Sequence, residues 1–102
     1  MILEVAILNV RSDEGPAFEA AMKVARPLIA ASKGFRTIEV RPCLETKDRY
    51  LLLVTWDTVE DHEIGFRQSD RYQEWRRLLH HFYDPFPVVE HYSDSIAGVG
   101  SP

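Results

Sequence analysis

Two segments of this 102-residue chain are apolar on both of the faces that a β-strand presents. Between Ile2 and Val10 only Glu4 and Asn9 are polar, and an unbroken apolar run, residues 51–54, lies inside the second segment, Arg49–Trp56. Because side chains alternate between the faces of a strand, a half-exposed strand would carry a polar residue at every second position. Both strands are therefore predicted to be covered on both sides.

A helix is predicted after Pro16, because apolar residues recur there at steps of three and four. They are Phe18, Met22, Ala25, Leu28 and Ile29. Pro27 lies inside this pattern and predicts a kink, and Gly34 ends the region with a residue that tolerates a left-handed conformation. The next strand is expected from Phe35 to Leu44, and a short polar turn joins it to the 49–56 strand as an antiparallel hairpin.

A second helical region is predicted from Asp57 or Thr58, whose side-chain oxygens can cap a helix. We expect it to break near Gly65 and to restart at Ser69 or Asp70, which are again residues of the N-cap type. Negative charge in the first turns of this region also favours a helix, because it complements the helix dipole.

A short last strand, Val88–Tyr92, completes the order β-α-β-β-α-β. Right-handed crossovers place both helices of this order on one face of the sheet, so we predict an α+β, ferredoxin-like fold with a four-stranded antiparallel sheet. Residues 1–95 are assigned to this single domain. Residues 96–102 offer little to bury and are expected to form a flexible C-terminal tail.

Two helices cover only one face of such a sheet, so its second apolar face still needs a cover. A second copy of the same face is the simplest cover, and we therefore expect a homodimer. The alternative is that the C-terminal tail, or long side chains such as Arg36 and Arg41, shield this face within one chain.

The composition argues against several classes of partner. Twelve basic and 16 acidic residues give a net charge of -4, which favours neither nucleic acid nor an anionic membrane surface. The longest apolar run is far shorter than the roughly 20 residues that a membrane span requires. The single cysteine, Cys43, excludes an internal disulfide framework and fits a reducing, cytoplasmic location.

Four stretches of the chain, taken in their order and spacing, carry a family resemblance. They are Ala31–Phe35, Leu52–His62, Ser69–Trp75 and Pro87–Tyr92. Together they resemble the antibiotic biosynthesis monooxygenase family. The resemblance implies that two sheets pair face to face as a dimeric α+β barrel, with one ligand pocket per subunit between sheet and helices.

Members of that family include oxygenases that oxidise aromatic polyketides or quinols without a metal or organic cofactor. The resemblance thus implies a cofactor-independent monooxygenase, an oxidoreductase that acts on a small aromatic compound such as a phenol, a quinol or a polyketide-like molecule. The competing class is a non-catalytic dimeric ligand-binding or stress-related domain, because fold does not fix function.

Haem-degrading relatives form a third, disfavoured alternative. They carry an asparagine on the first strand, which Asn9 matches within a residue, and a tryptophan and a histidine in the second helical region. The tryptophan position falls near Gly65 or Phe66 and the histidine position near Arg76. Trp75 and His80 lie elsewhere in that region and keep this alternative open.

Three polar residues, Asn9, His80 and Arg76, are the candidate catalytic groups. Oxygenation without a cofactor needs an electron-rich phenolate, held away from water beside groups that stabilise its charge. Asn9 lies on the strand face that also carries Leu3 and Ile7, so its amide needs a partner, either a backbone group or a ligand oxygen. Arg76 could equally be a surface residue.

Four aromatic residues, Tyr72, Phe66, Trp75 and Tyr83, are the candidate substrate-binding groups, with ordinary core packing as the alternative for Phe66 and Trp75. No metal site is expected, because the adjacent His80 and His81 point about 100° apart on a helix. His62 is expected to be a solvated surface residue.

Overall fold

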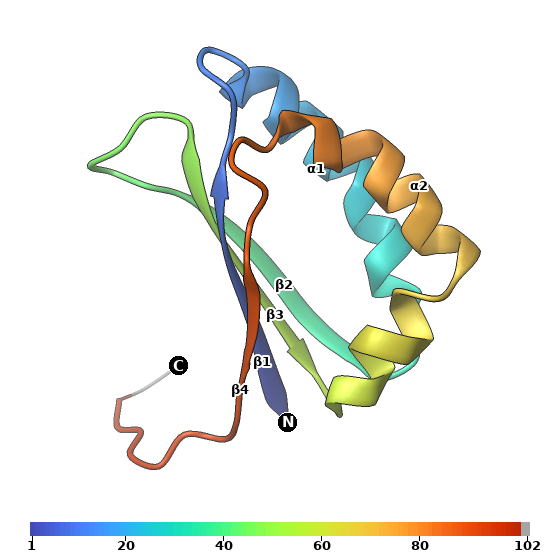
Figure 1. Ribbon diagram of the computed structural model, residues 1–102. Coiled ribbons are helices and arrows are strands. Elements are labelled where there is room, and N and C mark those ends of the chain that lie inside the picture. The colour runs from blue at the N-terminus through green and yellow to red at the C-terminus, as the bar shows by residue number, and fades with distance from the viewer. Residues whose placement is uncertain (101–102) are drawn as a thin grey trace.

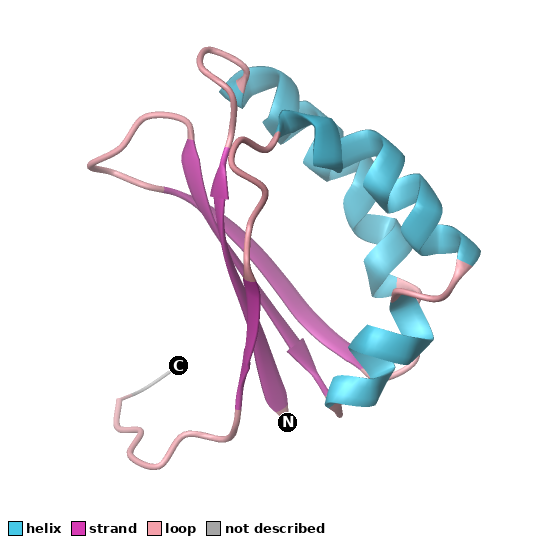
Figure 2. Ribbon diagram, in the orientation of Figure 1, coloured by secondary structure: helices cyan, strands magenta, loops and turns pink. Residues whose placement is uncertain are grey.

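The computed structural model describes residues 1–100 and has the predicted β-α-β-β-α-β order (Figure 1). Its strands are β1 (Ile2–Asn9), β2 (Phe35–Pro42), β3 (Arg49–Trp56) and β4 (Val89–Tyr92). They form one antiparallel sheet in the order β2-β3-β1-β4. Helices α1 (Gly15–Ala30) and α2 (Asp70–Leu79) both cover one face of it (Figure 2). The ferredoxin-like prediction is confirmed.

The bounds of the elements differ slightly from the predicted ones. β2 ends at Pro42 because the chain then turns away from the sheet, which leaves Leu44 exposed. β4 begins at Val89, one residue later than expected. α1 continues through Pro27 to Ala30, and the kink expected at this proline stays a prediction.

The core lies between the helices and the helix-facing side of the sheet. β1 and β3 each direct every second side chain into it. The largest fully buried side chains are Trp56, Phe18, Phe66, Leu8, Ile29, Leu79 and Val54.

The second helical region breaks where the sequence predicts. Thr58 Oγ1 accepts a hydrogen bond from the Asp61 amide at 3.1 Å, and a wide π-helical segment, η1 (Asp61–Phe66), follows. The His62 carbonyl accepts from the Arg67 amide five residues later, at 3.0 Å, which is the π-helical spacing. The side chain of Ser69 then accepts from the Tyr72 amide and caps α2. This wide turn places both His62 and Phe66 in the interior.

The opposite face of the sheet carries no helix (Figure 2). At the centre of this face the β1 and β3 side chains are apolar, and Ile7 is 53% exposed. The described C-terminal segment, residues 93–100, forms no helix or strand, and its Ile96 and Val99 side chains are fully exposed rather than packed on the sheet. Its flexibility stays a prediction, and residues 101–102 of the expected tail lie outside the described residues.

A helix that combines the length and the apolar character of a membrane span is not found in residues 1–100.

The close contact between the turn before β2 and the start of η1 can be tested by substitution. Gly34 has φ +79°, and an added Cβ would overlap the Asp61 carboxyl and come within 2.8 Å of the Asp61 Cβ. Gly34→Ala is therefore expected to lower the free energy of unfolding by about 1 to 3 kcal/mol, measured by urea unfolding. Gly65→Ala is the matched control: its Cβ would meet only the Glu60 carbonyl oxygen at 3.9 Å, so stability should be unchanged or slightly higher. Equal effects of the two substitutions would contradict this account.

Candidate functional site

A pocket lies between the helix-facing side of the sheet and the second helical region. Aromatic side chains form much of its wall, and these are Phe66, Tyr72, Trp75, Tyr83 and Phe86. Its polar lining consists of Glu4, His62, Arg67 and His80. The cavity measures about 70 Å³, roughly half the volume of about 150 Å³ at which an apolar cavity is known to bind benzene. A ligand larger than part of one ring must therefore extend through the mouth or move the walls.

Glu4 is the buried acid of this pocket. It lies on β1, in phase with Ala6 and Leu8, and its side chain faces the helices. The Trp56 indole N–H donates to Glu4 Oε1 at 2.9 Å, and His62 Nε2 lies 3.3 Å from the same oxygen. Burial raises the pKa of Glu4, against the opposing effects of the Trp56 hydrogen bond and the Arg67 charge.

His62 connects Glu4 to β4. Its ring stacks on Trp56 with 5.3 Å between the ring centroids, and its Nδ1 lies 2.8 Å from Nε2 of His91. Burial, followed by the charges of Arg67 and His91, lowers the pKa of His62 to about 3. Glu4 and His62 are therefore both driven toward their neutral forms.

The far end of the pocket is built around His80. Its ring centroid lies 5.8 Å from that of Tyr72, 6.0 Å from that of Tyr83 and 4.9 Å from that of Phe86. Burial, with smaller contributions from the charges of Arg76 and Arg67, lowers the pKa of His80. A neutral imidazole in an aromatic wall can donate or accept one hydrogen bond toward a ligand.

The structure brings together five of the seven residues singled out from the sequence. Phe66, Tyr72, Trp75, His80 and Tyr83 all line the pocket. Whether they bind or act on a substrate stays a prediction.

Asn9 and Arg76 do not line this pocket, so within one chain they do not converge with His80, and their catalytic role stays a prediction. Strand alternation places Asn9 on the opposite face of the sheet, where its Oδ1 accepts from Arg49 Nε at 3.0 Å. Arg76 is exposed, because it follows the buried Trp75 on α2 and so points about 100° away from it. Its remaining influence is the effect of its charge on the pKa of His80.

Sequence reasoning missed the two buried polar residues of the pocket. Glu4 was treated as an interruption of an apolar strand, although alternation alone puts it in phase with Ala6 and Leu8. The expectation that His62 lies at the surface is also wrong, since its side chain is 3% exposed. The π-helical turn that rotates it inward has no recognised sequence pattern.

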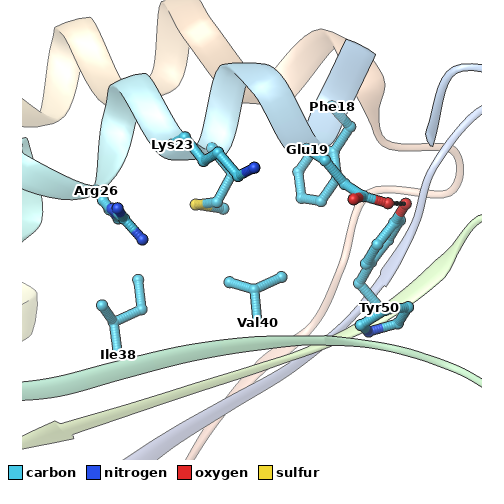
Figure 3. Close-up of a pocket in the computed structure, with 9 residues that line it drawn as sticks. Phe18, Glu19, Lys23, Arg26, Ile38, Val40 and Tyr50 are labelled. Atoms are coloured by element: carbon cyan, nitrogen blue, oxygen red, sulfur yellow. Dashed lines mark hydrogen bonds between the residues drawn. The ribbon is translucent and has the colours of Figure 1, made fainter. Parts of the chain in front are cut away.

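A second hollow, of about 200 Å³, lies between α1 and β2 (Figure 3). Lys23 and Arg26 extend from α1 above the apolar side chains of Ile38 and Val40 (Figure 3). At one end the Tyr50 hydroxyl donates to Glu19 Oε2 at 2.6 Å, and burial raises the pKa of Tyr50. Long cationic side chains commonly cover apolar surface in this way.

The comparison of the two hollows favours the pocket that contains Glu4. The hollow between α1 and β2 has the larger volume, but its cations are exposed and its lining includes no imidazole. The Glu4 pocket combines a buried carboxyl, two imidazoles and an aromatic wall, which are the groups that proton transfer to and from an aromatic ligand requires. It is the candidate site.

Comparison with known proteins finds a matching family and a similar sequence. Residues 1–78 match the family described as antibiotic biosynthesis monooxygenase. The uncharacterised protein YczJ of Bacillus subtilis (strain 168) is 48% identical over 94 residues, which cover 92% of this chain and 99% of YczJ.

Solved structures agree with that match. A Bordetella bronchiseptica protein named after the antibiotic biosynthesis monooxygenases is 35% identical, with a TM-score of 0.88 over 93% of this chain and 97% of that one. SnoaB from Streptomyces nogalater, a cofactor-independent oxygenase, has a TM-score of 0.73 over 96% of this chain and 94% of SnoaB. At 12% identity, the likeness to SnoaB shows a shared fold alone.

The lowered pKa of His62 predicts how acid affects stability. The unfolded chain takes up a proton at His62 below about pH 6.5, whereas the folded protein takes it up only near pH 3. Stability that is present above pH 6.5 is therefore lost progressively as the pH falls from 6.5 toward 3. His62→Gln should remove this dependence, so the loss in the free energy of unfolding between pH 7 and pH 4.5 should be smaller than in the wild type by up to about 2 kcal/mol. Urea unfolding at both pH values tests this, with His81→Gln as the exposed control; parallel losses in wild type and His62→Gln would refute it.

Proposed function

This chain belongs to the antibiotic biosynthesis monooxygenase family, and on that premise we propose that it is a cofactor-independent monooxygenase that oxidises a small phenol or quinol beside Glu4. The observation that carries the proposal is a buried, partly hydrogen-bonded carboxyl at an aromatic-walled pocket. Such a carboxyl has a proton-transfer partner in a phenolic hydroxyl, and the aromatic walls suit the ring.

The reaction we propose begins when the phenolic O–H bond breaks and its proton passes to Glu4. The phenolate, which is electron-rich, gives one electron to O2, and the resulting radical pair forms a C–O bond at a ring carbon that carries hydrogen. That carbon then loses its proton, the O–O bond breaks, and the outer oxygen leaves as water. The balance is one phenol and one O2 to one quinone and one water.

Two further groups and the size of the cavity support this chemistry. The charge of Arg67 reaches both Glu4 and His80, so it also favours a phenolate in the pocket that all three line. The neutral imidazole of His80 can donate a hydrogen bond to a ring oxygen. A single ring already needs the walls of this cavity of about 70 Å³ to move or must extend through its mouth, and a polyketide or a haem would need far more space, so a single-ring substrate is favoured.

Oxygen consumption tests the proposal directly. Wild-type protein, freed of metals by chelation, should consume O2 with at least one member of a panel of single-ring hydroquinones and electron-rich phenols. Glu4→Gln keeps the shape of the side chain but not its proton transfer, so turnover should fall by about 100-fold or more. Glu60→Gln, an exposed carboxyl in the same region, should retain activity. Binding of these compounds without turnover would instead support a non-catalytic ligand-binding domain.

We also propose that the protein is a homodimer paired through the bare face of its sheet. The apolar β1 and β3 side chains on that face and the exposure of Ile7 support this arrangement, because isolated soluble domains rarely leave such a face uncovered. The relatives' fold is compatible with it.

If the dimer forms in this way, charged substitutions at two adjacent positions of β1 should have different effects. Val5→Asp places a charge on the bare face and should convert a particle of twice the 11.8 kDa chain mass into a folded monomer, as measured by light scattering. Ala6→Asp places the charge in the core and should unfold the subunit. Val24→Asp, on an exposed position of α1, should leave the mass unchanged. A wild-type protein that stays monomeric at micromolar concentration contradicts the proposal.

A further inference from the structure

Three residues that are far apart in the sequence form a row that begins at the wall of the pocket. Glu4 lies on β1, His62 on η1 and His91 on β4, where His91 is the register partner of Glu4. Glu4 Oε1 lies 3.3 Å from His62 Nε2, and His62 Nδ1 lies 2.8 Å from His91 Nε2. Both contacts join atoms that can donate or accept a proton.

The row leads from the pocket to the surface. Glu4 and His62 have side chains that are 6% and 3% exposed, whereas His91 is 18% exposed. His91 Nδ1 in turn lies 3.8 Å from Oε1 of Glu63, whose side chain is 49% exposed. A proton that reaches His91 is therefore one step from solvent.

A protonated Glu4 needs an outlet. Such a carboxyl can accept a proton at one oxygen only if it gives up the proton held at the other. Oε1 contacts both Trp56 and His62, so a proton carried by Oε1 has His62 Nε2 as its acceptor, and we assign Oε2 to the ligand.

The tautomers follow from this arrangement. If Glu4 donates to His62 Nε2, the proton of neutral His62 is on Nδ1 and is donated to His91 Nε2. The proton of neutral His91 is then on Nδ1, on the side of Glu63. All donors point outward, from the pocket to the surface.

The geometry points to a proton relay, Glu4 to His62 to His91, that carries the proton of a bound phenol out of the pocket. The phenolic proton bonds to Glu4 Oε2 while the Oε1 proton moves to His62 Nε2, the Nδ1 proton of His62 moves to His91, and the Nδ1 proton of His91 passes to Glu63 or water. No imidazolium has to persist in the interior when these transfers are concerted. The inference rests on the proposed function, in which Glu4 touches the substrate and the two histidines act through it.

Few charged or titratable groups surround the relay. Arg67, which follows η1, acts on both Glu4 and His62 through its charge, and Glu63 faces His91. β3 contributes the indole of Trp56, which is not titratable. Arg67 favours the outward direction, because a cation repels the proton and stabilises the phenolate that remains.

The test uses 4-nitrocatechol, a phenolic probe whose neutral and ionised forms absorb at different wavelengths and whose electron-poor ring resists oxidation. When it is mixed with the wild type in a stopped-flow instrument, the bound probe should ionise, and a pH indicator in weak buffer should report proton release at the same rate. His91→Gln and His62→Gln should each slow ionisation at least tenfold. His81→Gln, an exposed histidine outside the row, should not.

Controls separate a relay from a structural role. Added imidazole should restore part of the rate in His91→Ala, which a loss of packing would not allow, and probe affinity and melting temperature should stay near the wild-type values for the His91 variants. Unchanged ionisation rates in both histidine variants, or a bound probe that stays neutral in the wild type, would overturn the relay.

Nitrogen NMR gives a second test without any ligand, since a proton on His62 Nε2 instead of Nδ1 at pH 7 would also overturn it. A relay that passes these tests in a protein that consumes no O2 with any quinol would leave the relay standing and remove the proposed oxygenase activity.

Discussion

The burial of one carboxyl, that of Glu4, determines how the interior of this domain is arranged. Burial disfavours the ionised form of this carboxyl, and the hydrogen bond from Trp56 and the charge of Arg67 offset part of that cost. Trp56 supplies one hydrogen bond from the neighbouring strand, and His62 approaches from the helical layer. His62 reaches Glu4 because η1 is wound as a π-helix, so the wide turn belongs to the same arrangement.

The two faces of the sheet therefore have different physical roles. The helix-facing side combines the apolar core with a small pocket, in which Glu4 Oε1 lies 3.3 Å from His62 Nε2. The bare side carries aliphatic residues at its centre, with Asn9 and Arg49 paired at one end. A single strand, β1, contributes to both sides, which explains why nearly all of its positions are apolar and why a substitution there acts differently at adjacent residues.

Much of the fold follows from local patterns in the sequence. The two-sided apolar strands required a covered sheet, and capping chemistry at Ser69 fixed the start of α2. The site was harder to predict. Asn9 and Arg76 were chosen for their chemistry and a family likeness, whereas strand alternation and the 100° step from Trp75 already place them outside the pocket. His62 could not be placed, because a helix of ordinary pitch would not rotate it inward as the π-helical turn does.

Arg67 gives the pocket an electrostatic reason to release a proton rather than to store it. Burial shifts Glu4, His62 and His80 toward their neutral forms, whereas Arg67 brings a positive charge to the lining of the same pocket. Ionisation of a bound phenol with the proton retained on a neighbouring imidazole would add a second positive charge to a region of low polarity, where repulsion is strong. Export of the proton leaves one phenolate and one guanidinium, a pair with no net charge. In the reaction we propose, the return of a proton along the same path would then supply the departing water, so a single outlet could serve both the first step and the last.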